Sequence, residues 1–169
     1  MKRLRLIGGK DRGATAVEFA LIAPLLFLLV FGIIDYGLWF SDSLSTRQGV
    51  REAARQGVVA NFGEDTCTLT GASGDANSRA LMCTAQDRIG SITGDPAVKV
   101  VAPDGWVRGK SLVVCAQIPV GVGTGIVPLP NDRVIESQVE MAIEKTDPVI
   151  PFSGGEETAP SGKDWSWCG

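Results

Sequence analysis

The chain has 169 residues and contains no histidine. Catalytic Ser-His-Asp triads, Cys-His pairs and histidine-ligated metal sites are therefore excluded. The glycine-rich stretch Gly121–Gly125 lacks the Gly-Lys-Ser/Thr ending of a phosphate-binding loop, and Pro128 and Pro130 follow where the helix of such a loop would begin. We interpret it as a loop between strands, and we expect the acidic pair Glu64 and Asp65 to be solvated. The sequence thus predicts no enzyme, and we expect no catalytic residue, cofactor, metal site or small-molecule substrate.

Charged residues are absent from Phe19 to Ile34, and after Asp35 the sequence stays largely apolar as far as Phe40. The 22 residues from the first of these positions to the last form about 33 Å of helix at about 1.5 Å per residue. That length spans a hydrocarbon core of about 30 Å. Tyr36 and Trp39 lie where an interfacial belt of aromatic side chains is expected. The sequence therefore predicts one transmembrane helix.

Charge is unevenly distributed along the chain. Five basic residues against Asp11 give the first thirteen residues a net side-chain charge of +4, and the rest has 11 basic and 18 acidic residues, a net charge of -7. Basic residues beside a membrane helix tend to stay in the cytoplasm. The acidic portion after the leader is not expected to bind nucleic acid, because such binding depends on clustered Lys and Arg. We therefore expect a basic cytoplasmic leader (1–13), a transmembrane helix (14–40), an extracytoplasmic domain (41–145) and a Pro/Gly/Ser-rich tail (146–169) with little regular structure.

Cysteine is absent from the first 66 residues, and all four cysteines, Cys67, Cys83, Cys115 and Cys168, follow the apolar run. An even number in a translocated region predicts two disulfides, for which three connectivities exist. Four independent buried thiols are the alternative. A bond between Cys67 and Cys83 would close a short loop onto a helix, and Cys115 is the favoured partner of Cys168. The absence of Cys-x-x-Cys argues against zinc binding or thioredoxin-like chemistry.

The membrane helix is expected to continue outward, since Ser41–Ala60 contains no proline, with Gly49 and Gly57 as weak points. Its predicted inner face consists of Leu44, Val50, Ala54 and Val58. Arg47, Arg51 and Arg55 recur at a spacing of four and form a basic stripe on another face. This stripe is either solvated or docked against an acidic partner or sheet.

The remaining pattern predicts one shorter helix and three strands. The helix is expected from Ser78 to about Ile92, and the strands at Ala97–Ala102, Ser111–Val120 and Val134–Lys145. In the third strand apolar residues alternate with Glu and Gln, although its Glu residues also have helical spacing, so a helix is the competing interpretation. The predicted fold class is α+β: a long N-terminal transmembrane helix that continues outward and packs on a small antiparallel sheet with one shorter helix.

The most informative motif precedes the apolar run, where Gly13 is followed five residues later by Glu18 and then by Phe19. A carboxylate at the mouth of a membrane helix is costly unless it lies near the interface or has a cationic partner. Cleavage after Gly13 would create such a cation, the new amino terminus, in this subunit or in a neighbouring one. The alternative is a glutamate that is simply tolerated at the cytoplasmic interface.

This segment resembles a type IV pilin-like leader, which a prepilin peptidase cuts after Gly to leave Glu at the fifth mature position. More closely, RGATAVEFALIAPLLFLLVFGIIDYG resembles the N-terminal signature of TadE-like minor pseudopilins of tight-adherence (Flp) pilus systems. The matching residues, besides the Leu-rich run, are Arg12, Gly13, Ala16, Val17, Glu18, Phe19, Ala20, Pro24, Phe31, Gly32, Asp35 and Gly37. Among the residues of the transmembrane segment we single out Phe19, Pro24, Gly32 and Ile34.

The resemblance implies a minor pseudopilin or assembly factor in the cytoplasmic membrane, with the membrane, prepilin peptidase and other pilin and pilus-assembly proteins as partners. It also implies processing between Gly13 and Ala14 and an assembly role for Glu18 and Phe19. One alternative is an unprocessed, signal-anchored extracytoplasmic binding module. Another is a secreted protein released at Ser41-Asp42-Ser43.

Overall fold

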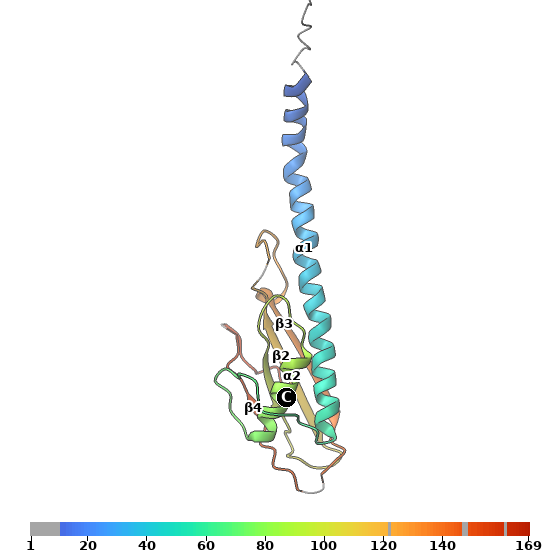
Figure 1. Ribbon diagram of the computed structural model, residues 1–169, viewed down its shortest axis with the longest axis vertical. Coiled ribbons are helices and arrows are strands. Elements are labelled where there is room, and N and C mark those ends of the chain that lie inside the picture. The colour runs from blue at the N-terminus through green and yellow to red at the C-terminus, as the bar shows by residue number, and fades with distance from the viewer. Residues whose placement is uncertain (1–10, 122, 147–148, 161) are drawn as a thin grey trace, which may run out of the picture.

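The computed structural model describes residues 11–121, 123–146, 149–160 and 162–169, so most of the expected basic leader lies outside the described residues. Its helices are α1 (Asp11–Val58) and α2 (Ala76–Arg88), with a short 3-10 turn at Asn131–Arg133. Its strands are β1 (Ala97–Val101), β2 (Ser111–Pro119), β3 (Val134–Ala142) and β4 (Gly155–Glu156). The sheet is antiparallel with the order β3-β2-β1-β4. The predicted α+β class is confirmed (Figure 1).

Helix α1 has 48 residues, which correspond to about 72 Å at about 1.5 Å per residue. Its N-terminal part stands clear of the domain, whereas its C-terminal part lies along the sheet (Figure 1). The first part is apolar around its whole circumference, while the second buries only one face, on which Val50, Ala53 and Ala54 are fully buried. One helix therefore serves both as the free apolar segment and as part of the domain core.

The predicted inner face of α1 is correct for Val50, Ala54 and Val58 but wrong for Leu44, which is 43% exposed. Asp42 and Thr46 are buried instead. Position 44 is two residues from each of these and therefore lies roughly 160° around the helix from both. The buried face of α1 therefore begins with two polar residues, Asp42 and Thr46, rather than with an apolar one.

The two glycines that appeared to be weak points are contact points between elements. A Cβ at Gly49 would overlap the side chain of Ile89, just beyond the end of α2. A Cβ at Gly57 would lie 2.8 Å from Leu112 on β2 and 3.0 Å from Leu81 on α2. Glycine is needed at both positions because the neighbouring elements approach the helix backbone closely.

Helix α2 begins at Ala76 because Asp75 caps it, accepting a hydrogen bond of 2.9 Å from the backbone N–H of Ser78. It ends at Arg88, since Ile89 adopts an extended backbone. The predicted helix is therefore real, but the structure shifts it towards the N-terminus. All three predicted strands also end one to three residues earlier than expected, and β3 is a strand rather than the competing helix.

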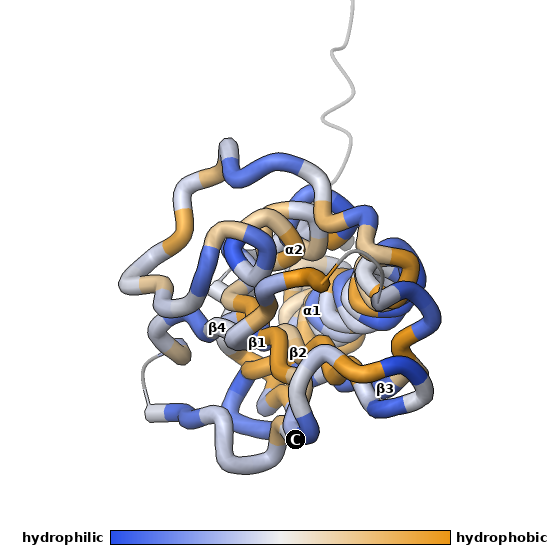
Figure 2. The backbone as a smooth tube through the Cα atoms, turned by 90° about the horizontal axis from the view of Figure 1, so that it is seen from below, coloured by the Kyte–Doolittle hydropathy of each residue, from blue (hydrophilic) through white to orange (hydrophobic). Residues whose placement is uncertain are grey.

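The sheet is covered on both faces, and this explains why β2 is buried along almost its whole length. One face carries the main core, formed with α1 and α2. The other face carries a smaller cluster of Val113, Cys115, Trp165 and Cys168, so the C-terminal segment lies across the sheet from the helices (Figure 2). The two layers have separate apolar cores.

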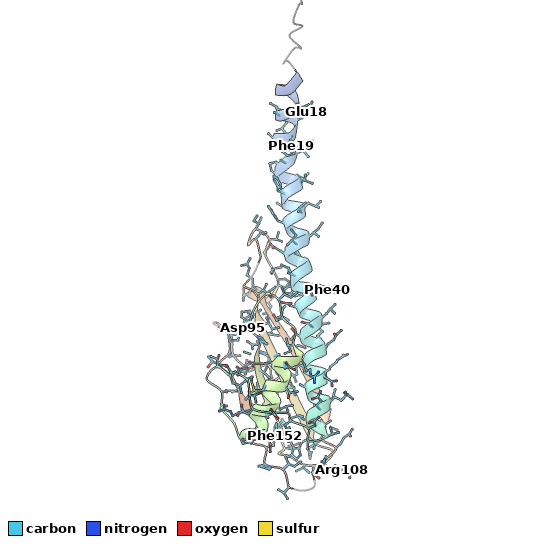
Figure 3. The ribbon with its side chains drawn as sticks, in the orientation of Figure 1. Glu18, Phe19, Phe40, Asp95, Arg108 and Phe152 are labelled. Carbon is cyan, nitrogen blue, oxygen red and sulfur yellow. A yellow bond between two sulfur atoms is a disulfide. The ribbon has the colours of Figure 1, made fainter. Side chains whose placement is uncertain are left out.

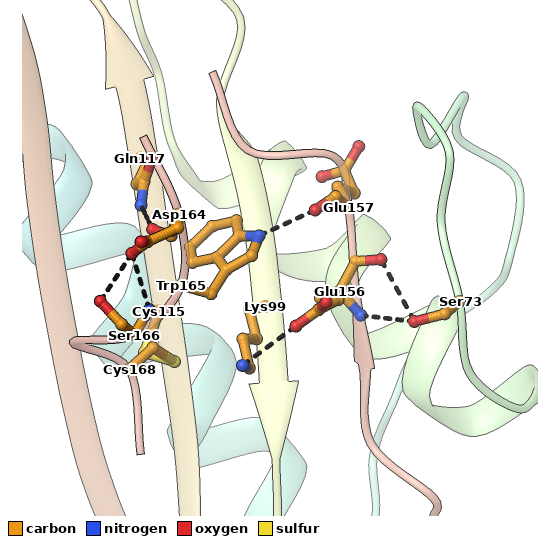
Figure 4. Close-up of polar contacts among 10 residues, drawn as sticks. All are labelled: Ser73, Lys99, Cys115, Gln117, Glu156, Glu157, Asp164, Trp165, Ser166 and Cys168. Carbon is orange, nitrogen blue, oxygen red and sulfur yellow. Dashed lines mark hydrogen bonds and ion pairs between the residues drawn. A yellow bond between two sulfur atoms is a disulfide. The ribbon is translucent and has the colours of Figure 1, made fainter. Parts of the chain in front are cut away.

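The tail is more ordered than its composition predicts. It contributes β4, which pairs with β1, and the Trp165 indole donates a 2.8 Å hydrogen bond to the Glu157 carbonyl (Figure 4). Gln117 on β2 donates to the Asp164 carbonyl at 2.6 Å. The tail thus forms the second layer of the domain with little regular structure of its own.

The domain contains two disulfides, Cys67–Cys83 and Cys115–Cys168. The first joins the loop after α1 to α2, and the second joins the central strand to the end of the chain. These are the two pairings that the sequence favoured. No cysteine within the described chain is free.

Candidate functional site

The residues of the processing and assembly motif all lie on the free end of α1. Gly13, Ala14, Glu18 and Phe19 are exposed, and Figure 3 shows the last two far from the domain. A Cβ at Gly13 would meet no atom within 4 Å. A glycine inside a helix costs about 1 kcal/mol relative to alanine. Packing within the described structure gives no reason for this glycine.

The apolar part of α1 presents large side chains in every direction. Phe19 and Ile33 are 61% and 66% exposed, and Pro24 lies inside the continuous helix. The helix is long and apolar enough to cross a membrane, and it fits a single-pass membrane anchor. Of the singled-out residues, Ile34 is exposed, while Gly32 is partly covered by a loop from the domain.

Asp35, three residues after Gly32, makes a polar contact between this helix and the domain. Its carboxylate accepts hydrogen bonds from the Thr124 backbone N–H at 2.8 Å and from the Thr124 hydroxyl at 2.6 Å. One residue later, the Tyr36 hydroxyl donates to the Pro128 carbonyl at 3.2 Å. The only charged residue between Glu18 and Asp42 is therefore covered by the loop that joins β2 to β3.

Asp42 makes a second, deeper junction. It is fully buried and accepts hydrogen bonds from the backbone N–H groups of Ile92 and Thr93 at 3.0 and 2.9 Å. The hydroxyls of Ser91 and Thr93 also donate to it. A buried carboxylate is tolerated only when its oxygens are satisfied, and here the chain between α2 and β1 satisfies them. Two aspartates on one face of α1 thus fasten the helix to two different loops.

The basic stripe on the outer face of α1 is exposed. Arg55 forms an ion pair of 2.9 Å with Glu52, and hydrogen bonds from Arg55 and then Gln56 lower the pKa of Glu52 to about 2. Arg47 and Arg51 line a shallow groove with residues 136–139 of β3. The stripe therefore borders the sheet and faces solvent.

A further buried carboxylate, Glu157, fastens the tail. It accepts hydrogen bonds from the backbone N–H groups of Thr70 and Val98 at 2.9 and 2.8 Å, and from the Gln86 side chain at 2.8 Å. Burial raises the pKa of Glu157, and the three hydrogen bonds oppose that shift. Because both oxygens are occupied by structural donors, the arrangement ties segments together and offers no group for acid–base chemistry.

Sequence reasoning did not identify Asp35, Asp42 and Glu157 as structural ties. Asp35 and Asp42 carried a usable signal, because each is a charge next to or within apolar sequence and needs a partner. Glu157 carried none, since its donors come from segments 59 to 87 residues away. The structure brings the motif residues Gly13 to Phe19 into contact with none of these carboxylates.

Comparison with known protein families gives a match over part of the chain. The family model described as TadE-like protein matches residues 13–55, from the motif glycine to Arg55 in the last turn of α1. No curated protein and no solved structure matches the chain. The chain therefore carries a TadE-like region over residues 13–55, which confirms the predicted resemblance and indicates a role related to the Tad pilus.

Proposed function

We propose that this protein is a minor pseudopilin or assembly factor of a Flp-type pilus, processed by prepilin peptidase and anchored in the cytoplasmic membrane with its domain outside. It acts by contacts with other pilin and pilus-assembly proteins and performs no catalysis. The observation that carries the proposal is the coincidence of the TadE-like match with α1. The matched segment is one helix that is free at its motif end and packed into a domain at its other end.

The processing step is supported by the lack of a packing role for Gly13. Its replacement by a larger residue would meet no neighbour in the described structure, so the fold does not require glycine there. Cleavage between Gly13 and Ala14 leaves an amino terminus about 6 Å along the helix from Glu18. That cation can neutralise Glu18 within the subunit or in an adjacent one.

The proposed orientation is supported by charge and by the disulfides. The leader carries a net charge of +4, which favours its retention in the cytoplasm. The two disulfides lie in the domain beyond the apolar helix, and such bonds persist in oxidising compartments. Both features favour a cytoplasmic N-terminus and an extracytoplasmic domain.

The first experiment determines the N-terminal residue of the membrane-extracted protein, in cells with and without prepilin peptidase. We expect a start at Ala14 that depends on the peptidase. Gly13→Val is expected to abolish processing, because the side chain blocks the cleavage position. Gly9→Val is the matched control, since it makes the same change at another leader glycine and should be processed normally.

An intact leader in peptidase-positive cells would contradict the proposal and favour the unprocessed, signal-anchored binding module. A start near residues 41–43 would instead indicate release by signal peptidase. Equal processing of both glycine variants would show that cleavage does not depend on Gly13.

A further inference from the structure

The loop between β2 and β3 has an unusual composition for an exposed segment. Residues 121–130 contain no charged side chain and include Ile126, Val127, Leu129 and two prolines. Ile126 is 56% exposed. Figure 1 shows this loop rising from the sheet beside the free part of α1, at the end of the domain that faces the apolar segment. We call residues 123–130 the membrane-facing loop.

This loop is fixed to α1 at three levels. Thr124 donates two hydrogen bonds to Asp35, and the Pro128 carbonyl accepts one from Tyr36. Val127 lies against the backbone of Gly32, where a Cβ would be 3.7 Å from its methyl group. The contacts reach back into the apolar run, so the position of the loop along the helix is set.

The resulting geometry conflicts with the thickness of a bilayer. From Glu18 to Gly32 the helix rises only about 21 Å, whereas a hydrocarbon core is about 30 Å thick. If Glu18 lies at the inner boundary, the free helix is too short by about 9 Å to keep the whole loop above the outer boundary. Either the loop enters the bilayer or Glu18 does.

We propose that the membrane-facing loop inserts its tip, centred on Ile126, into the outer leaflet beside α1. The occupant of this surface is phospholipid, and the inference rests on the proposed membrane placement of α1. The surface is continuous with the apolar helix, which is its strongest support. The domain is therefore held at the membrane surface by two adjacent segments, α1 and the membrane-facing loop.

The chemistry of the loop suits insertion. Pro128 and Pro130 have no N–H group, and the Thr124 donors are already satisfied by Asp35. The Ile126 backbone N–H also lies 3.4 Å from the Thr124 hydroxyl oxygen, so the residue at the centre of the loop has an internal partner for its donor. Polar side chains begin where the loop ends, and Lys163 lies 2.9 Å from Asn131 and 3.6 Å from Asp132. These groups mark the level at which the aqueous phase begins.

The test uses the full chain, alone, in phosphatidylcholine vesicles. A small fluorescent amino acid replaces Ile126, and lipids carrying a nitroxide near the headgroup end of the acyl chain act as the quencher for this position. Lipids carrying the nitroxide near the methyl end of the acyl chain serve for position 28, which lies about 15 Å along the helix from Glu18 and therefore near the middle of the bilayer. Val107 is the matched control, because it is an equally exposed apolar loop residue, 50% exposed, near the opposite end of the domain beside Arg108 (Figure 3). A third probe at Leu28 reports whether α1 spans the vesicle membrane.

We expect quenching at position 126 to exceed that at position 107 by at least about twofold, as for groups buried 5–10 Å into the interface. Quenching at 28 but not at 126 would overturn the loop insertion while leaving the membrane anchor in place. A protein partner as the true occupant would give that same result, since the vesicles contain only this chain. Failure of quenching at both 28 and 126 would overturn the membrane placement itself.

Discussion

Single carboxylates join segments of this domain that are distant in sequence. Asp42 binds the chain before β1, Glu157 binds Thr70 and Val98, and Asp75 both caps α2 and accepts a hydrogen bond from the Ser153 backbone N–H in the tail. Each carboxylate accepts bonds from backbone donors that would otherwise be left unpaired. At the residue scale, these three carboxylates hold the domain together by accepting hydrogen bonds from loops and from the tail.

Asp75 gives a residue-scale prediction. Partial burial acts to raise the pKa of Asp75, but hydrogen bonds from Ser78 and Ser153 outweigh it and hold the pKa below its ordinary value. Asp75→Ala should lower the free energy of unfolding at pH 7 by about 1 kcal/mol, the usual cost of losing an N-cap. Urea unfolding of the full chain in detergent measures the change, and Asp95→Ala, at an exposed aspartate, is the control (Figure 3).

The pH dependence of this effect has a defined sign. A carboxyl whose folded-state pKa is lowered stabilises the protein above its ordinary pKa of about 3.9, and that contribution is lost as the pH falls through the lowered value. The difference between the protein and Asp75→Ala should therefore shrink below about pH 4. A difference that stays constant or grows on acidification would refute the role of the ionised form.

At the scale of elements, periodic pattern was sufficient to predict most of the fold. The long helix, the shorter helix, the three main strands and the α+β class follow from apolar runs, alternation and turn residues. The motif at the free end of α1 could also be identified from the sequence, since Gly13 and Glu18 directly precede the apolar run.

What the pattern could not predict depends on contacts between distant segments. The Cys115–Cys168 bond was expected, but the order of the tail also depends on Glu157 and on the Asp75–Ser153 bond, neither of which has a local sequence signature. Leu44 was assigned to the wrong face because apolarity indicated burial, while the register is set by the partners of Asp42. The contacts of Asp35 and Asp42 with loops that follow much later in the sequence were missed because they too join distant segments.

The disulfides give an element-scale prediction. In the chain-entropy model a disulfide stabilises more when it closes a longer loop, and the separations here are 16 and 53 residues. Replacing Cys67 and Cys83 by alanine should cost about 3 kcal/mol, and replacing Cys115 and Cys168 about 4 kcal/mol. Urea unfolding of both double variants measures these costs.

The second pair has a further expected consequence. Loss of Cys115–Cys168 should release the tail from the sheet face and make the chain near Trp165 accessible to protease, whereas loss of Cys67–Cys83 should leave that layer in place. Equal protection of the tail in both variants would show that its packing does not depend on the covalent bond.

The whole molecule supports a prediction about Glu18. Glu18→Ala should leave membrane insertion intact or improve it, since a carboxylate in a membrane helix is unfavourable. Pilus assembly should fall by about tenfold or more, because an interaction with a charged group contributes about 1.5–3 kcal/mol. Glu18→Asp, which keeps the charge, should be affected less. Membrane levels by immunoblot and pilus counts by electron microscopy measure the two effects, and normal piliation of Glu18→Ala would exclude this role.

The continuity of α1 has a mechanical consequence. The same 48-residue helix carries the free motif end and supplies Val50, Ala53 and Ala54 to the centre of the core. A pull or a turn applied to the membrane end is therefore transmitted along a stiff rod directly into the domain, without a linker to absorb it. Axial load is borne in shear by the packing of α1 on the sheet and by the Asp35 and Asp42 hydrogen bonds. The helix cannot be withdrawn from the domain without unfolding it, so the domain acts as a stop on movement of the anchor.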